Sequence, residues 1–126
     1  MEKTIINTKE APSPIGPYNQ AVLAGNLLFV SGQIAINPAT GSLDIADITT
    51  ETHLVMHNVK AVLAAAGMDF QHVVKTTIFL SDMSLFANVN EIYGKYFKSD
   101  FPARETVAVK GLPKGVNVEI SVIASK

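Results

Sequence analysis

The sequence contains no cysteine and no tryptophan among its 126 residues. Without cysteine the chain can form no disulfide, can offer no thiolate nucleophile and can hold no metal ion through sulfur. Thiol-based catalysis, oxidative regulation through a thiol, and cysteine-ligated zinc or iron–sulfur sites are therefore excluded.

Charged residues are also scarce, at 17% of the chain, and neither sign dominates: 10 basic and 11 acidic residues give a formal net charge of −1. A chain with no basic excess lacks the charge that drives binding to phosphate backbones, so we expect no nucleic acid as partner. Hydrophobic residues make up 48%, which favours a folded chain over a disordered one. The low charge also indicates that some apolar surface is buried against a partner chain.

The apolar runs of the sequence are short. The longest of them, such as residues 61–67, fall far below the roughly 18 residues that a membrane span needs, so we expect no association with membranes. The first seven residues are too polar for the apolar core of a signal peptide. We therefore expect a cytoplasmic protein with a single domain over residues 1–126, since domains run roughly 100 to 200 residues.

Hydrophobic periodicity and turn residues divide the chain into strands and helices. Strands are expected at 4–7, 20–24, 27–34, 73–80, 104–109 and 116–124, and helices at 49–66 and 84–98. Thr49 and Thr50 are expected to cap the first helix, Gly67 to follow its end, and Ser84 to cap the second helix. The order β-β-β-α-β-α-β-β indicates an α+β fold.

Two of the expected strands are apolar on both faces. In the last strand the even-numbered residues from 116 to 124 are apolar, and the opposite face still carries an isoleucine. In the strand before the second helix, alternation places Val74 on the face of Ile78 and Val73 on the face of Phe79. Two helices can cover only one face of such a sheet, so a second copy of the chain is expected to cover the other.

Two charged residues are candidates for chemistry. Arg104 is the only arginine of the chain and opens a strand after a Phe-Pro-Ala segment; its guanidinium could clamp a carboxylate, although a plain surface charge is the commoner use. Glu119 lies inside the most apolar strand, either facing solvent or as an interfacial carboxylate that needs a partner. Whether the two residues share a face depends on strand register, which a one-residue slip reverses.

Two histidines have the spacing of a zinc-binding helix, because His53 and His57 are four residues apart. The glutamate of that motif is missing between them, Lys60 follows on the same face and would repel a metal ion, and His72 is no obvious third ligand. We therefore expect a solvated polar face and no metal site. Ser31 lies in no GxSxG frame, which argues against a serine nucleophile.

Seven short motifs follow one another along nearly the whole chain. They are IGPY at 15–18, VSGQI at 30–34, NVK at 58–60, VKTTIFL at 74–80, VNEIY at 89–93, FPAR at 101–104 and VEI at 118–120. Each motif alone is weak, but the ordered set is specific. It resembles the RidA family of enamine/imine deaminases, also called YjgF/YER057c/UK114.

That resemblance implies a chorismate-mutase-like α+β domain over residues 1–126, with a mixed sheet and two helices on one face. It implies a homotrimer with clefts between subunits. The implied activity is hydrolysis of 2-aminoacrylate and 2-iminobutanoate to 2-oxoacids and ammonia, without a cofactor. A second interpretation is a non-catalytic regulatory module that binds 2-oxoacids in the same cleft, since fold alone does not grant function.

The resemblance also implies roles for particular residues. Arg104 would clamp the substrate carboxylate, and Glu119 would hold or activate the attacking water, with a pKa raised in a partly dry cleft. The residues expected to lie beside the substrate are Tyr18, Ser31, Gly32, Asn90 and Tyr93. Two positions depart from the family pattern: Thr106 stands where members commonly have cysteine, and Glu105 where a small residue is frequent. We expect Thr106 to contact the substrate and to alter the shape of the pocket.

Overall fold

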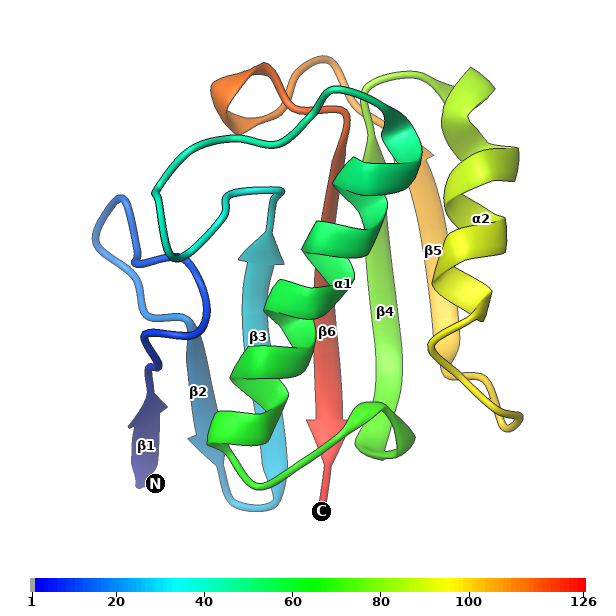
Figure 1. Ribbon diagram of the computed structural model, residues 1–126. Helices are drawn as coiled ribbons and strands as arrows, with labels where there is room; N and C mark the ends of the chain where they lie inside the picture. The colour runs from blue at the N-terminus through cyan, green and yellow to red at the C-terminus, as the bar shows by residue number, and fades with distance from the viewer. Residues whose placement is uncertain (1) are drawn as a thin grey trace.

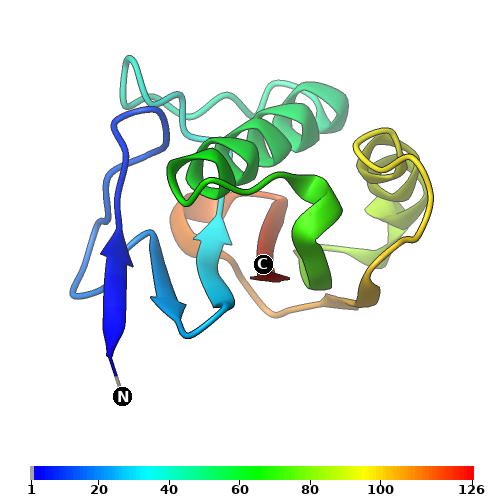
Figure 2. The ribbon, with the colours of Figure 1, turned by 90° about the horizontal axis from the view of Figure 1, so that it is seen from below.

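The computed structural model describes residues 2–126, which form one six-stranded mixed sheet and two α-helices. Both helices lie on the same side of the sheet (Figures 1 and 2). The strands run in the order β1-β2-β3-β6-β4-β5. The elements are β1 Lys3–Ile6, β2 Ala21–Ala24, β3 Leu27–Gln33, α1 Ile48–Ala65, β4 Val73–Leu80, α2 Phe86–Gly94, β5 Ala103–Ala108 and β6 Val118–Ser125. The expected α+β fold is therefore confirmed.

Antiparallel pairing joins all neighbouring strands except β4 and β5. Strands β2 and β3 form the expected hairpin, whose turn uses Gly25 with φ of 63°. Strand β4, helix α2 and strand β5 form a crossover unit, so β5 lies parallel to β4 at the edge of the sheet. Only a short connection separates β5 from β6 in the sequence, but in the sheet β4 lies between these two strands.

Helix α1 begins one residue earlier than expected, because an aspartate caps it rather than a threonine. The Asp47 carboxylate accepts a hydrogen bond at 2.8 Å from the backbone N–H of Thr50. Gly67 follows the helix with φ of 73°, the left-handed conformation that favours glycine after a helix end. The prediction for the C-terminus is therefore confirmed, and the threonine cap was wrong.

Helix α2 is shorter than the sequence predicts. The Asp82 carboxylate accepts a hydrogen bond at 2.8 Å from the N–H of Ser84 and caps a single 3₁₀ turn, after which the α-helix starts at Phe86. The helix ends at Gly94, four residues before the expected end. The prediction of Ser84 as the cap of this helix is wrong, because Ser84 lies inside the 3₁₀ turn and the N-cap position of α2 is Leu85, which makes no side-chain cap hydrogen bond. No helix within residues 2–126 is long and apolar enough to span a membrane.

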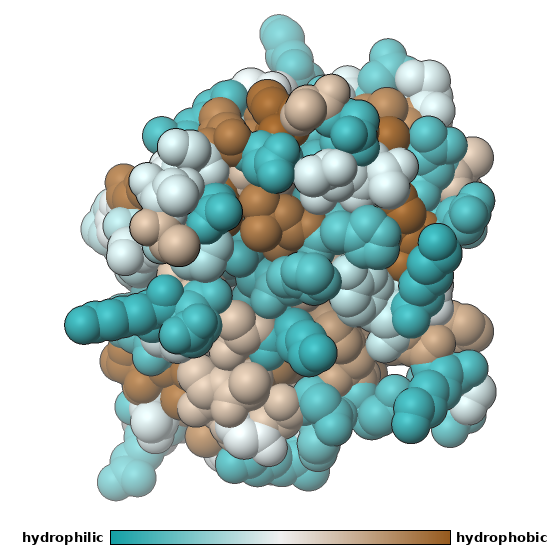
Figure 3. All heavy atoms as spheres, in the orientation of Figure 1, coloured by the Kyte–Doolittle hydropathy of each residue, from teal (hydrophilic) through white to brown (hydrophobic). Residues whose placement is uncertain are grey.

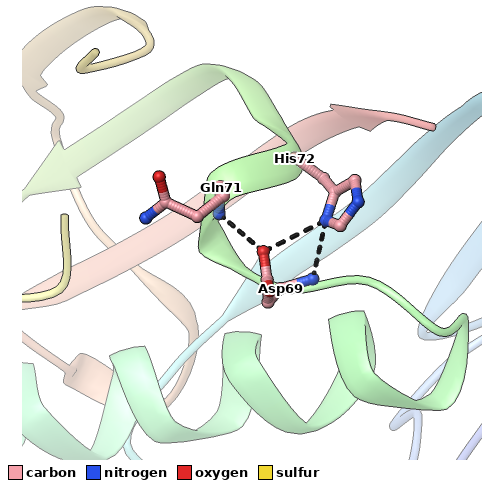
Figure 4. Close-up of polar contacts among 3 residues, drawn as sticks. All are labelled: Asp69, Gln71 and His72. Carbon is pink, nitrogen blue, oxygen red and sulfur yellow. Dashed lines mark hydrogen bonds and ion pairs between the residues drawn. The ribbon is translucent and has the colours of Figure 1, made fainter. Parts of the chain in front are cut away.

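A 3₁₀ helix over Phe70–His72 joins α1 to β4 and is held by a reciprocal cap (Figure 4). The Asp69 carboxylate accepts from the N–H of Gln71 at 2.9 Å, and Nδ1 of His72 accepts from the N–H of Asp69 at 3.1 Å. Nδ1 of His72 also lies 3.1 Å from the Asp69 carboxylate oxygen, so both backbone and side chain of Asp69 contact this ring nitrogen. The third histidine of the sequence therefore has a structural contact of its own.

The helices cover the sheet face that carries the even-numbered residues of β6, which are buried from Val118 to Ala124 as predicted. Strand β4 departs from simple alternation. Its pairing with β6 shifts between Val73 and Lys75, and this bulge buries Val73 while it leaves Val74 49% exposed. The predicted facing of these two valines is wrong, because one extra residue in a strand exchanges the faces beyond it.

The opposite face of the sheet carries no helix within residues 2–126 and is apolar at its centre. Phe29 of β3 is 44% exposed beside Ile123 of β6, and Val107 of β5 is 42% exposed beside Phe79 of β4. On the helix side, by contrast, hydrophilic residues are interspersed among the apolar ones (Figure 3). The open face is thus the kind of apolar surface that a partner chain covers.

Candidate functional site

Arg104 and Glu119 point to opposite faces of the sheet. Since β4 separates their strands, each is placed by its partner in β4: Arg104 lies beside Thr76, and Glu119 lies beside Phe79. Positions three apart in a strand face opposite sides. Thr76 is buried under the helices, so Arg104 lies on the helix side and Glu119 on the open side.

A pocket on the open side surrounds Glu119. Its lining comes from the proline-rich loop, from β3 and β6, and from the turn before β6: Ile15, Tyr18, Ser31, Gly32, Pro113 and Glu119. Together these residues form the glutamate half-site. Behind it a narrower apolar recess continues to Ile34 and Ile36. Three residues expected at the substrate, Tyr18, Ser31 and Gly32, are therefore brought together with Glu119.

Hydrogen bonds hold the loop side of the glutamate half-site. The Ser31 hydroxyl donates to the carbonyl of Asn19 at 2.7 Å, and the Ser31 N–H donates to the carbonyl of Gln20 at 2.9 Å. The Tyr18 hydroxyl accepts from the N–H of Ile15 at 3.2 Å. The buried Gln20 amide donates to three backbone carbonyls of the preceding loop. The loop is thereby fixed beside β3 without help from a ligand.

Gly32 makes room for the Glu119 carboxylate. Strand β3 has a bulge in which Ser31 and Gly32 lie opposite the single residue Ser121 of β6. A Cβ added at Gly32 would overlap a carboxylate oxygen of Glu119 and would lie 2.8 Å from its carboxyl carbon. Only glycine therefore leaves room for the carboxylate at this position beside β3. Burial at this place raises the pKa of Glu119.

Gly32→Ala is expected to lower the pKa of Glu119 towards its ordinary value, because the new methyl group pushes the carboxylate out into solvent. The measurement is an NMR titration of the Glu119 carboxyl carbon in both proteins. Gly111→Ala is the matched control, since a Cβ there has no atom within 4 Å. An unchanged Glu119 pKa in Gly32→Ala would refute the proposed cause of the shift.

A second pocket lies on the helix side, where Arg104 is at the edge of the sheet below α2. It is lined by Asn90, Tyr93, Gly94, Phe101, Pro102 and Arg104, which together form the arginine half-site. Within residues 2–126 the ion pairs are His72 with Asp69 and Lys75 with Glu105, so no carboxylate neutralises Arg104. Its charge is therefore available to an anion.

Thr106 lies on the same face of β5 as Arg104, two residues further along. Its hydroxyl oxygen is buried and has no hydrogen-bond partner within residues 2–126. Glu105, between them, faces the open side and forms an ion pair with Lys75 at 2.9 Å. Of the two departures from the family pattern, Glu105 thus has a local partner, whereas the Thr106 hydroxyl is left without one.

Thr106→Val is expected to raise the free energy of unfolding by about 1 kcal/mol, because it replaces an unpartnered buried hydroxyl with a methyl group of the same shape. Urea denaturation of both proteins measures the difference. Thr76→Val is the control and should destabilise, since the Thr76 hydroxyl accepts a hydrogen bond from Tyr93 at 2.9 Å. A less stable Thr106→Val would show that the hydroxyl has a partner in the protein.

Glu51 is a buried acid in the first turn of α1 that the sequence analysis did not single out. Its carboxylate accepts from the backbone N–H and the side-chain amide of Asn117, at 2.7 Å and 2.8 Å, and from the N–H of Val118 at 3.2 Å. These bonds tie α1 to the start of β6. They therefore fix the strand that carries Glu119.

The two helical histidines lie against the chain segment after α2. Nδ1 of His53 is 2.6 Å from the Tyr96 hydroxyl oxygen, and the ring of His57 lies 6.0 Å from the Tyr96 ring. Burial lowers the pKa of His57, with smaller contributions from His53 and Lys60. Between residues 2 and 126 no three histidine, aspartate or glutamate side chains are grouped so that they could hold a metal ion.

Comparison with known proteins shows the family. The profile of the family described as Endoribonuclease L-PSP matches residues 8–126. A RutC family protein of Pyrococcus horikoshii is 50% identical over 124 residues, which are 98% of each chain. The human protein named 2-iminobutanoate/2-iminopropanoate deaminase is 46% identical over 122 residues, 97% of this chain and 89% of its own.

The chain belongs to the RidA (YjgF/YER057c/UK114) family. The crystal structure of Escherichia coli TdcF with bound serine matches with a TM-score of 0.94 and 41% identity, over 98% of each chain. In this RidA-family chain Asn90 and Tyr93 gather around Arg104, and Tyr18, Ser31 and Gly32 gather around Glu119. The two groups lie on different faces, so a single copy does not unite them.

Proposed function

We propose that the protein is a deaminase that hydrolyses reactive enamine and imine intermediates, such as 2-aminoacrylate and 2-iminobutanoate, to 2-oxoacids and ammonia. The observation that carries the proposal is the pair of complementary half-sites. One presents an unpaired guanidinium in a pocket, and the other presents a half-buried carboxylate with a raised pKa. The human relative named as an imine deaminase supports this chemistry.

The complete site forms between two copies of the chain in a homotrimer. The arginine half-site of one copy faces the glutamate half-site of the next, so the contact is heterologous, and three copies close it into a ring. The apolar open face, with Phe29 and Val107 more than two fifths exposed, supports association of the copies. Each trimer then contains three equivalent sites.

The chemistry needs few groups once the substrate is held. Arg104 binds the substrate carboxylate through two N–H groups, which fixes the imine carbon in front of Glu119. An enamine such as 2-aminoacrylate first tautomerises to its imine. Glu119 takes one proton from the attacking water as the water oxygen bonds to the imine carbon, and it returns that proton to the imine nitrogen, which gives a carbinolamine. The remaining hydroxyl proton then passes to the amine nitrogen as the C–N bond breaks, so that the oxygen becomes the carbonyl oxygen of the 2-oxoacid and the nitrogen leaves as ammonia. A raised pKa suits a group that must both accept and return a proton.

The direct test generates 2-aminoacrylate in the cuvette with a serine/threonine dehydratase and follows release of the 2-oxoacid. Addition of the protein should accelerate release over the dehydratase alone, in proportion to its concentration. Calorimetry with 2-oxobutanoate on the same preparation is the companion measurement. Binding without any acceleration would instead support the non-catalytic module that senses 2-oxoacids.

A further inference from the structure

Two aromatic rings lie against the Arg104 guanidinium. Its central carbon is 5.1 Å from the ring centre of Tyr93 and 5.7 Å from the ring centre of Phe86, both within the roughly 6 Å over which a cation is attracted to a ring face. Both rings belong to α2 and lie two turns apart on it. The sequence interpretation includes Tyr93 but not Phe86, which looks like any apolar helix residue.

Aromatic contacts hold a cation without competing for its hydrogen bonds. Ring faces offer electron density but no oxygen acceptor, so they attract the guanidinium and leave its N–H groups unoccupied. A carboxylate partner would hold Arg104 as well, but it would neutralise the charge and occupy the same N–H groups that an anionic substrate needs. The absence of such a partner among residues 2–126 fits a guanidinium that is oriented by rings alone.

We infer that Phe86 is a positioning residue, which together with Tyr93 holds the guanidinium of Arg104 ready for a carboxylate ligand. That the ligand of Arg104 is a substrate carboxylate rests on the proposed function, whereas the contact between the Phe86 ring and the guanidinium does not. Tyr93 is fixed independently, because it is buried and its hydroxyl donates to Thr76 at 2.9 Å. Phe86 is 36% exposed at the first turn of α2, so it can be changed without opening the core.

The single arginine makes the contact directly measurable. Protein labelled with ¹⁵N-arginine gives one Nε–H signal, which reports Arg104 alone. A proton over a ring face is shifted upfield by the ring current. We expect Phe86→Leu, which keeps apolar bulk but removes the ring, to move this signal downfield. Phe86→Tyr keeps the ring and should leave it near its original position.

The functional consequence is measured on the same three proteins. Phe86→Leu is expected to weaken 2-oxobutanoate binding and to raise KM for the imine by about 3- to 30-fold, with kcat nearly unchanged, because the clamp holds substrate and transition state alike. Phe86→Tyr should rescue both values. In an Arg104→Ala background, Phe86→Leu should cause no further loss of kcat/KM, since the residue acts only through Arg104.

The outcomes separate the inference from the proposed function. An Nε–H signal that is the same in wild type and Phe86→Leu would overturn the inference, as would equal losses of kcat/KM with and without Arg104. If the signal moves but the wild type neither binds 2-oxobutanoate nor deaminates, the ring contact stands and the proposed function fails. Phe86→Met serves as the ring-free variant if Phe86→Leu does not fold, and sedimentation velocity checks the assembly of each protein.

Discussion

Glu119→Gln is expected to lower kcat on 2-aminoacrylate by about 10²- to 10⁴-fold, the usual contribution of a general acid–base group. Glutamine keeps the size of the side chain and one hydrogen-bond acceptor, but it cannot take a proton from water. The dehydratase-coupled assay measures the loss. Binding of 2-oxobutanoate should persist, because Arg104 is intact and a negative charge near an anionic ligand has been removed. Unchanged turnover would make Glu119 a structural residue only.

The same substitution should not weaken the fold. Burial raises the pKa of Glu119 in the folded state above its value in the unfolded chain. The stability that Glu119 contributes is therefore fully present at a pH below the pKa of the unfolded state, and it is lost as the pH rises through the pKa of the folded state. At neutral pH wild type therefore carries a destabilising ionised carboxylate that Glu119→Gln lacks. We expect the variant to melt at a higher temperature than wild type at neutral pH, and the difference to vanish in acid. This comparison controls for unfolding as the cause of lost activity.

Arg104→Ala is expected to lower kcat/KM by about 10- to 150-fold, which corresponds to roughly 1.5 to 3 kcal/mol for a hydrogen bond to a charged group. Arg104→Lys should restore little of the lost kcat/KM, because an ammonium group cannot form a bidentate contact with a carboxylate. Kinetics with the coupled assay measures both variants.

The matched control for charge is Lys110→Ala, an exposed lysine outside both half-sites, which should leave kcat/KM unchanged. If kcat/KM of Arg104→Ala equals that of wild type, the arginine half-site does not bind substrate. An equal loss in Lys110→Ala would attribute the effect to overall charge rather than to the clamp.

Local patterns in the sequence predict the elements well but not their arrangement. Apolar periodicity and turn residues locate every strand and both helices to within a few residues, because these features depend on near neighbours in the chain. The position of β4 between β5 and β6 is a tertiary property, and it decides that Arg104 and Glu119 face opposite sides. The bulge that exchanges Val73 and Val74 likewise depends on pairing with β6 rather than on local composition.

The sequence supplied candidate residues for the site but not their division between the two faces of the sheet. The resemblance implied one set of residues beside the substrate and did not predict that Asn90 and Tyr93 lie with Arg104 on one face and the others with Glu119 on the opposite face. Thr106, also expected to contact the substrate, lines neither pocket.

Phe86 and Glu51 escape reasoning from the sequence, because each has an ordinary residue type for its place in a helix. The space that Gly32 leaves for the Glu119 carboxylate appears only when β3 and β6 are side by side.

Combining the two impaired variants in one assembly tests most directly whether each site is built from two chains. Arg104→Ala retains an intact glutamate half-site, and Glu119→Gln retains an intact arginine half-site. Equal co-expression gives about three quarters mixed trimers, each with one complete site of three, so the mixture should recover about one quarter of wild-type activity. Activity no greater than the mean of the two parent variants would contradict a site shared between subunits.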